Sequence, residues 1–225
     1  MAVLLGVDTG GTYTDAVLVE DDKTVLASAK SLTTRSDLAQ GIGASVAAVI
    51  DRAGVDPASI AMAALSTTLA TNALVEGHGG RVALVYIGFN RKDLATHGLT
   101  DALAGDPLIV LEGGHTHAGV EAAPLDGVVL SDWLAGLVGV SAFAVASQFG
   151  TRNPAHELKA AEIIRAATGA PVSCSHHLSA KLNGPKRALT ALLNARLIGM
   201  IDRLIGRAQD ALIASGVNAP LMVVR

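Results

Sequence analysis

Cysteine, aromatic residues and charge are all scarce in this sequence. Its 225 residues include one cysteine, Cys174, with only 3% aromatic and 16% charged residues. A single cysteine excludes an internal disulfide, and no basic stretch precedes Asp8, so the sequence predicts a cytoplasmic protein. Because 50% of the residues are hydrophobic, we expect a core of aliphatic side chains, as in helices packed on a sheet.

Basic runs and long apolar runs are also missing. The 17 lysines and arginines are outnumbered by 20 acidic residues and form no stripe, which argues against a nucleic-acid surface. Residues 133–149 carry no charge, but this run is shorter than the roughly twenty residues that a membrane helix needs. Glycines and polar residues interrupt it, so we expect a short helix and then a buried strand, and no membrane partner.

The hydrophobic periodicity predicts an α/β fold with a mixed sheet and flanking helices. The first three strands follow one another closely, and strands and helices alternate afterwards. Residues 91–127 are rich in glycine, histidine and loop signals, so we expect an inserted lobe there. The predicted strands are 3–7, 16–20, 24–30, 60–65, 81–87 and 171–175; the predicted helices run from Ser36 to Gly54, from Asn153-Pro154 to Gly169, and over about 185–215 with a stop at Gly216.

The stretch "GVDTGGTYTDAVL" places an aspartate and two glycines at a turn between apolar runs. It has neither the G-x-G-x-x-G nor the G-x-x-x-x-G-K-[ST] spacing, and no helix signal follows the glycines. The pattern therefore predicts a β-hairpin whose N–H and hydroxyl groups surround a phosphate, with Asp8 holding Mg²⁺ through water. The alternative is an ordinary turn made from Asp and Gly.

This stretch resembles the first phosphate-binding hairpin of the actin, hexokinase and sugar-kinase superfamily, in the form typical of the hydantoinase A/5-oxoprolinase family. Tyr13 between Thr12 and Thr14, followed by Asp15, matches that form. A second segment, "STTLATNALVEGHGGRVALV" at 66–85, is similar to the family's Thr-Thr-x-Ala-Thr-Asn-Ala segment. A weaker match is "GPKRALTALLNARL" at 184–197, with Arg187, Thr190 and Asn194 at the polar positions.

The resemblance implies a ribonuclease H-like, actin-like ATPase lobe that uses ATP and Mg²⁺ to hydrolyse a cyclic amide such as a hydantoin or 5-oxoproline. It assigns phosphate binding to Gly10, Gly11, Thr12 and Thr14, the Mg²⁺ contact to Asp8, and catalytic or substrate contacts to Asp8, Asp15, Thr67, Thr68 and Asn72. Only one such hairpin is present, so we expect the N-terminal portion of a longer enzyme. Expected partners are the C-terminal remainder or a second subunit, and a further copy of the chain.

Two alternatives stay open. A small-molecule kinase lobe of the sugar-kinase type would use the same hairpin but release a phosphorylated product. A nucleotide-binding or subunit-docking module would not be catalytic. ATP titration and product analysis distinguish these classes.

Other reactive side chains have simpler interpretations. His115 and His117 would share one face of a strand, but without a third ligand we expect a solvated loop. His176 and His177 would splay to opposite faces of a strand, with one toward a cleft and no metal bound. Cys174 is expected to be a buried small hydrophobe rather than a nucleophile. Lys186 and Arg187 are expected to be solvated charges at a helix start.

Overall fold

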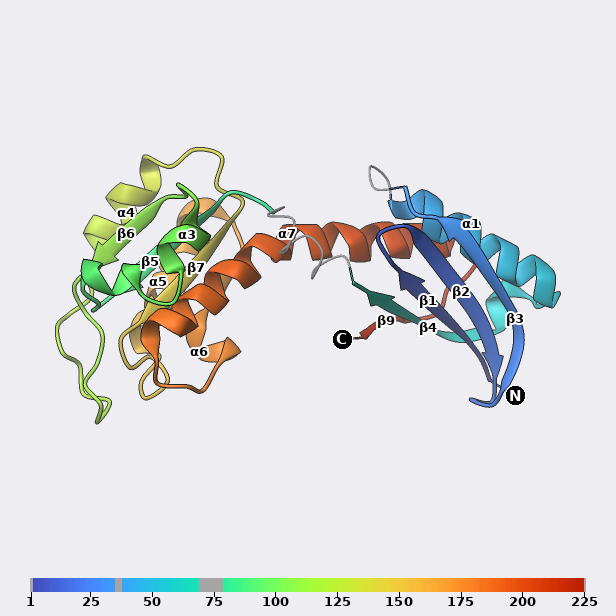
Figure 1. Cartoon of the computed structure of the whole chain (residues 1–225), viewed down its shortest axis with the longest axis horizontal. Helices are drawn as coiled ribbons and strands as arrows, with labels where there is room; N and C mark the ends of the chain where they lie inside the picture. The colour runs from blue at the N-terminus through green and yellow to red at the C-terminus, as the bar shows by residue number, and fades with distance from the viewer. Residues whose placement is uncertain (1, 35–37, 69–78, 225) are drawn as a thin grey trace. The chain divides into compact units, whose positions relative to one another are not determined.

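The computed structural model describes residues 2–34, 38–68 and 79–224. They divide into two compact units: the described residues of 1–78 and 200–225 belong to the first, and residues 79–199 to the second (Figure 1). The long helix α7, Gly184–Ala214, contributes residues to both units.

The first unit contains a five-stranded mixed sheet in the order β3-β2-β1-β4-β9. β1, β2 and β3 are antiparallel neighbours in this sheet, and β4 and β9 run parallel to β1. The mixed sheet with flanking helices that the sequence predicted is confirmed in this unit. The strands are β1 Val3–Thr9, β2 Tyr13–Glu20, β3 Thr24–Leu32, β4 Ile60–Thr67 and β9 Leu221–Val224; a short 3₁₀ turn, η1 Pro57–Ser59, precedes β4.

Successive side chains of β1 point to opposite faces of this sheet. Leu5 and Val7 are buried in a core with α1, Leu38–Ala53, and with residues of α7 from Leu204 onward, on the face that α1 covers in Figure 1. Asp8 is exposed on the opposite face. The core therefore fixes β1 and directs Asp8 away from it.

The second unit contains a parallel sheet in the order β6-β5-β7-β8. β5 and β7 are buried along their whole length because helices cover both faces. Residues 91–127 lie within this unit, and whether they form a separate lobe stays a prediction. The elements are β5 Val82–Ile87, η2 Arg91–Ala95, α3 Leu99–Leu103, β6 Leu108–Leu111, α4 Gly127–Ala135, β7 Ala142–Ser147, α5 Ala155–Thr168, β8 Val172–Cys174 and α6 Ser175–Leu178.

Most of the predicted boundaries are confirmed. α1 ends just before Gly54 and α5 ends just before Gly169. Both glycines have positive φ. The predicted cap at Ser36 lies outside the described residues. The apolar run 133–149 is divided between α4 and β7, and among the described helices none is long and apolar enough to cross a membrane.

Candidate functional site

The turn between β1 and β2 is a tight hairpin. The strands pair from Val3 with Glu20 to Thr9 with Thr14, and the Gly10 N–H donates to the Tyr13 carbonyl oxygen over 3.0 Å. A Cβ at Gly10 would lie 3.2 Å from that carbonyl, so a side chain there would crowd the turn. The predicted hairpin is confirmed, with Gly10, Gly11 and Thr12 at its tip.

Asp8 and Asp15 are directly opposite each other in the hairpin, and both line a cavity of about 470 Å³, to which Lys30 of β3 and Arg52 of α1 also contribute. Asp15 forms a 3.0 Å ion pair with Lys30 of the neighbouring strand. Asp8 is exposed, and within the described part of the chain its carboxylate has no hydrogen bond or ion pair. The carboxylate of Asp8 is thus available to a ligand, whereas that of Asp15 already has a cation beside it.

Buried threonines attach the hairpin to its neighbours. The Thr14 hydroxyl is fully buried and lies 2.9 Å from the Thr33 hydroxyl, and Thr67 donates to the Thr9 carbonyl over 3.0 Å. Thr9 Oγ1 is buried without a partner among the described residues. Thr14 therefore has a structural role in this geometry, and phosphate binding by Thr14 stays a prediction.

The remaining predicted site residues lie at the end of β4. Thr67 pairs with Thr9 across the parallel strands, so the chain leaves β4 beside the hairpin. Thr68 is exposed at this end. Asn72 lies outside the described residues. The structure thus brings together Asp8, Asp15, the hairpin tip and Thr67, and their roles in binding or catalysis stay predictions.

In the second unit the sequence analysis missed a buried carboxylate, Glu157 on α5. This side chain is fully buried and accepts five hydrogen bonds. Its Oε1 accepts from the N–H of Ser147 (2.8 Å) and from the hydroxyls of Ser147 (3.3 Å) and Ser175 (2.7 Å). Its Oε2 accepts from the backbone N–H (3.0 Å) and the ring Nδ1 (2.7 Å) of His176. The only local sequence signal for this buried carboxylate was its place in the first turn of the helix predicted to start at Asn153-Pro154.

Arg187 is buried in the same network, which corrects the expectation of a solvated charge. It is 1% exposed and donates to the carbonyl oxygen of Ser147 over 2.7 Å and to the Ser175 hydroxyl over 3.3 Å. Burial lowers the pKa of the Arg187 guanidinium, and the charge of Glu157 raises it again. Ser175 therefore links a buried cation to a buried anion.

The prediction for His176 and His177 was also wrong in its geometry. Both lie in the short helix α6 rather than on a strand, so their rings stay close, with centroids 4.0 Å apart. The metal-ligating atoms of Glu157, Cys174 and His176 lie within 4.8 Å of one another. Cys174 is buried as expected, and burial followed by the charge of Glu157 raises its thiol pKa to about 11.

His176 lines a second cavity, of about 300 Å³, in the second unit. This cavity lies beyond the carboxyl ends of β7 and β8, because its lining comes from the segments that follow these strands. The lining residues are Gly150, Thr151, Arg152, Pro154, His176, Ala180 and Leu182.

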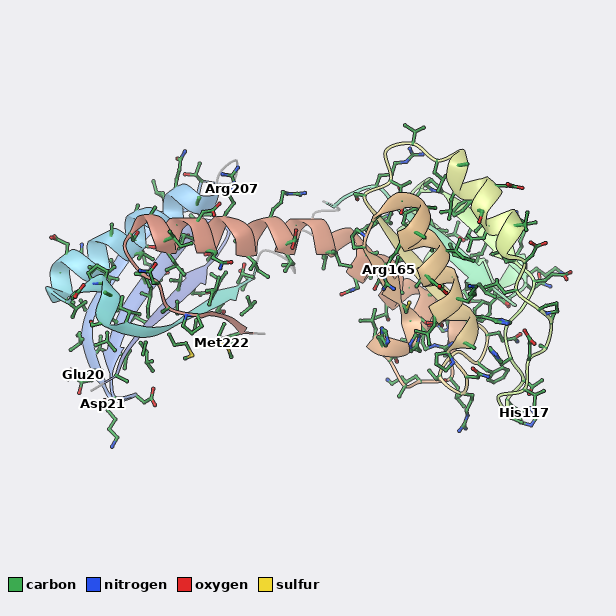
Figure 2. All side chains as sticks on the ribbon, turned by 180° about the vertical axis from the view of Figure 1, so that it is seen from behind. Glu20, Asp21, His117, Arg165, Arg207 and Met222 are labelled. Atoms are coloured by element: carbon green, nitrogen blue, oxygen red, sulfur yellow. The ribbon has the colours of Figure 1, made fainter. Side chains whose placement is uncertain are left out.

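His115 and His117 differ from the expectation of one solvated pair. His115 is 2% exposed and packs against the ring of His156, whereas His117 is exposed on the loop between β6 and α4 (Figure 2). His156 accepts from the Gly114 N–H at Nδ1 (2.9 Å) and therefore donates from Nε2 to Glu121 (2.8 Å). Burial, and then the neighbouring His156, lower the pKa of His115.

Sequence comparison relates this chain to subunits of larger enzymes. It is 28% identical over 253 residues to the acetophenone carboxylase gamma subunit of Aromatoleum aromaticum, covering 98% of this chain and 34% of that subunit. It is 30% identical over 231 residues to the caprolactamase subunit alpha of Pseudomonas jessenii, covering 92% and 33%. The chain thus spans about a third of the length of these curated relatives.

Two solved structures share the fold. The ATP-dependent caprolactamase from Pseudomonas jessenii superposes with a TM-score of 0.79 and 27% identity, over 98% of this chain and 35% of that one. Nucleotide-free acetone carboxylase superposes with a TM-score of 0.74 and 18% identity, over 96% and 35%, which supports the fold alone. The model of the hydantoinase/oxoprolinase N-terminal region matches residues 4–168. The chain belongs to the hydantoinase/oxoprolinase N-terminal region family.

Proposed function

We propose that this chain is the phosphate-binding N-terminal lobe of an ATP-dependent enzyme that hydrolyses cyclic amides. The observation that carries the proposal is the hairpin itself, in which Asp8 and the Gly10-Gly11-Thr12 tip adjoin a cavity of about 470 Å³. Family membership and the similarity to a caprolactamase subunit support this choice of chemistry.

The residues at the hairpin fit MgATP. Mg²⁺ prefers oxygen ligands and keeps part of its water shell, and Asp8 offers an exposed carboxylate without a partner among the described residues. The tip combines a hydroxyl at Thr12 with glycines, where no Cβ keeps a phosphate from the backbone. The ion pair between Lys30 and Asp15 would hold the second carboxylate away from the incoming phosphates.

When bound, MgATP would supply the phosphoryl group that activates the amide oxygen of the substrate for attack by water. The task of this lobe is then positional and electrostatic, because phosphoryl transfer depends on alignment and on stabilising charge at the transferring group. Asp8 would hold the hydrated metal, the hairpin tip would hold phosphate oxygens, and Thr67, Thr68 and Asn72 would contact the substrate or orient it.

Product analysis tests this proposal. The enzyme that contains this lobe, with its remaining domains or subunits, is incubated with MgATP and either hydantoin, 5-oxoproline or caprolactam, and phosphorus NMR and mass spectrometry follow the products. Free phosphate together with an opened ring supports hydrolysis. A stable phosphorylated product would instead support the small-molecule kinase. Nucleotide binding with no turnover of any of the three substrates would support a non-catalytic module.

A second candidate is ATP-coupled carboxylation, favoured by the match to an acetophenone carboxylase subunit over 98% of this chain. Acetophenone with bicarbonate replaces the cyclic amide in the same assay. Product carboxylate that depends on MgATP, without opening of any ring, would favour this candidate over the first.

A further inference from the structure

One face of the five-stranded sheet in the first unit is without a covering helix among the described residues. α1 and α7 both pack on the face that carries Leu5 and Val7 (Figure 1). The side chains that alternate with these two residues point the other way, to a face that we call the outer face. The apolar side chains of the outer face are not part of the core that α1 and α7 complete.

The strand register orders the outer face into three rows that cross the strands. The first row consists of Val25, Val19, Leu4 and Met62. The middle row consists of Ser28, Val17, Gly6, Ala64 and Met222. The third row, beside the hairpin tip, consists of Lys30, Asp15, Asp8, Ser66 and Val224. The outer face is thus apolar in its first two rows and charged in the row beside the hairpin tip.

The second unit provides an internal comparison. Its central strands β5 and β7 are buried along their whole length, by α3 and α7 on one face and by α4 and α5 on the other. In the first unit β1, β4 and β9 are also parallel neighbours, and sheets of parallel strands are normally covered on both faces. The outer face therefore calls for a further layer, which the described residues of the first unit do not supply.

The middle row forms a groove because its central residues are small. Gly6 and Ala64 are neighbours there, and a Cβ at Gly6 would lie only 3.1 Å from Val17 Cγ1. These three residues line the cavity of about 470 Å³, and Arg52 is the one residue of α1 in its lining. The groove therefore has an apolar floor that larger side chains of another segment can fill.

The exposure of the apolar side chains supports an interface. Val25 and Met222, on the two edge strands of the sheet, are 62% and 55% exposed. Leu4, Val19 and Met62 of the first row are only half-buried. Exposed apolar surface with a polar rim marks interaction sites in soluble proteins, and the charged third row is such a rim.

A helix suits this surface better than a loop or a single strand. The backbone N–H and C=O groups of a helix are paired within it, whereas an irregular segment on a sheet face would bury such groups without partners. The charged row limits how far the helix can extend. Burial of Asp8 and of the Asp15–Lys30 ion pair beneath an apolar segment would cost free energy.

Relatives of this chain contain enough additional polypeptide to provide the helix. The caprolactamase from Pseudomonas jessenii superposes on 98% of this chain, which accounts for only 35% of its own chain. The family model that matches this chain describes an N-terminal region. In such an enzyme the additional polypeptide follows the shared lobe, and it belongs to the same chain.

We propose that the two apolar rows of the outer face bind an amphipathic helix from the part of the polypeptide that follows this lobe in the complete enzyme. The helix carries apolar residues at i, i+3, i+4 and i+7, and it leaves the third row with Asp8 uncovered. The inference rests on one part of the proposed function, that this chain is a lobe of a longer enzyme. It is independent of the chemistry assigned to that enzyme.

Photo-crosslinking through methionine identifies the occupant. Met62 of the first row and Met222 of the middle row both lie on the outer face. The complete enzyme is produced with photo-methionine in place of methionine, irradiated, and digested for mass spectrometry. We expect both positions to cross-link to one segment after residue 225 with the helical apolar spacing. Cross-links only to residues 1–225, of the same chain or a second copy, or to another subunit, would overturn the proposal.

Cysteine labelling of the complete enzyme measures the coverage. Met222→Cys should react with a maleimide at least about tenfold more slowly than Ala58→Cys, because a covered thiol reacts only through transient opening. Ala58 is an exposed residue of η1 in the same unit, and the native Cys174 is buried. Equal labelling rates for the two variants would contradict the proposal.

Neither measurement uses nucleotide or substrate, so their outcome is separate from that of the product analysis. Protection of Met222→Cys in an enzyme that opens no cyclic amide would support the docked helix and refute the proposed chemistry. Unprotected Met222→Cys in an enzyme that opens such rings with ATP would refute the docked helix alone.

Discussion

Asp8 and Asp15 are paired across the β1–β2 hairpin and line the same cavity, yet only Asp15 has a cation beside it, the Lys30 ammonium at 3.0 Å. The two carboxylates are therefore not equivalent. Asp15 is part of the ion-paired surface of the sheet, whereas the Asp8 carboxylate is the one that would hold hydrated Mg²⁺ under the proposed function.

The first prediction concerns stability. Asp8→Asn is expected to change the free energy of unfolding by no more than about 0.5 kcal/mol, as is usual for exposed residues without partners. Chemical denaturation of the variant, beside Asp22→Asn in the exposed β2–β3 turn, checks this. A loss above about 1 kcal/mol, a typical value for a structural residue, would assign Asp8 a role in the fold.

The second prediction concerns the approach of α1 to the sheet. A Cβ at Gly41 would lie 2.9 Å from the Leu32 carbonyl oxygen and 3.2 Å from Thr14 Oγ1. We therefore expect Gly41→Ala to destabilise the first unit by about 1–3 kcal/mol, the usual cost of overpacking.

Gly206→Ala on α7 is the matched control, because nothing lies within 4 Å of its Cβ position. Alanine should stabilise that helix by up to about 1 kcal/mol. The denaturation midpoint should be lower than that of the wild type for Gly41→Ala and higher for Gly206→Ala. Equal midpoints would show that α1 does not pack as closely as the structure indicates.

The third prediction concerns the buried carboxylate. Glu157→Gln replaces an acceptor of five hydrogen bonds with a group that must donate to some of the same donors. It also leaves Arg187 buried without its compensating charge, so we expect a loss of about 3–5 kcal/mol. Glu162→Gln, on the exposed side of α5, should cost less than about 1 kcal/mol. Similar losses in the free energy of unfolding for Glu157→Gln and Glu162→Gln would contradict the structural role assigned to Glu157.

The fourth prediction follows from His115. Its pKa is lowered in the folded state by burial, so below the unfolded value near 6.5 the unfolded chain binds more protons than the folded one. Stability is therefore full above that pH and falls as the pH drops through 6.5 toward the lower folded value. The free energy of unfolding is measured from pH 7.5 to 5. His115→Gln should make it fall less steeply with decreasing pH, whereas His117→Gln, a change at an exposed residue of the same loop, should leave the pH dependence as it is.

The hairpin could be predicted from sequence because its information is local. A pair of glycines follows an apolar run and precedes β-branched residues, with no helix signal after it. This local pattern excludes a helix after the turn and predicts two strands joined by it. The same is true of α5 and α7, whose starts and stops are marked by Asn153-Pro154, Gly169 and Gly216.

The second unit could not be predicted to the same degree because its site depends on distant pairings. Glu157, His176 and Arg187 come together only through the packing of α5, α6 and α7 against β7 and β8. Arg187 looks like a solvated helix-start charge because the acceptors that satisfy it include Ser147, 40 residues away in sequence. His176 was misplaced because four residues of helix follow β8 where a continued strand was expected.

The central claim is that the hairpin serves ATP-dependent opening of a cyclic amide. The most direct measurement is the ratio of phosphate released to ring opened by the complete enzyme, compared between Asp8→Asn and Asp22→Asn. We expect one phosphate for each ring opened, with turnover lowered at least about 10²-fold by Asp8→Asn and unchanged by Asp22→Asn. Ring opening without ATP, or wild-type turnover in Asp8→Asn, would contradict it.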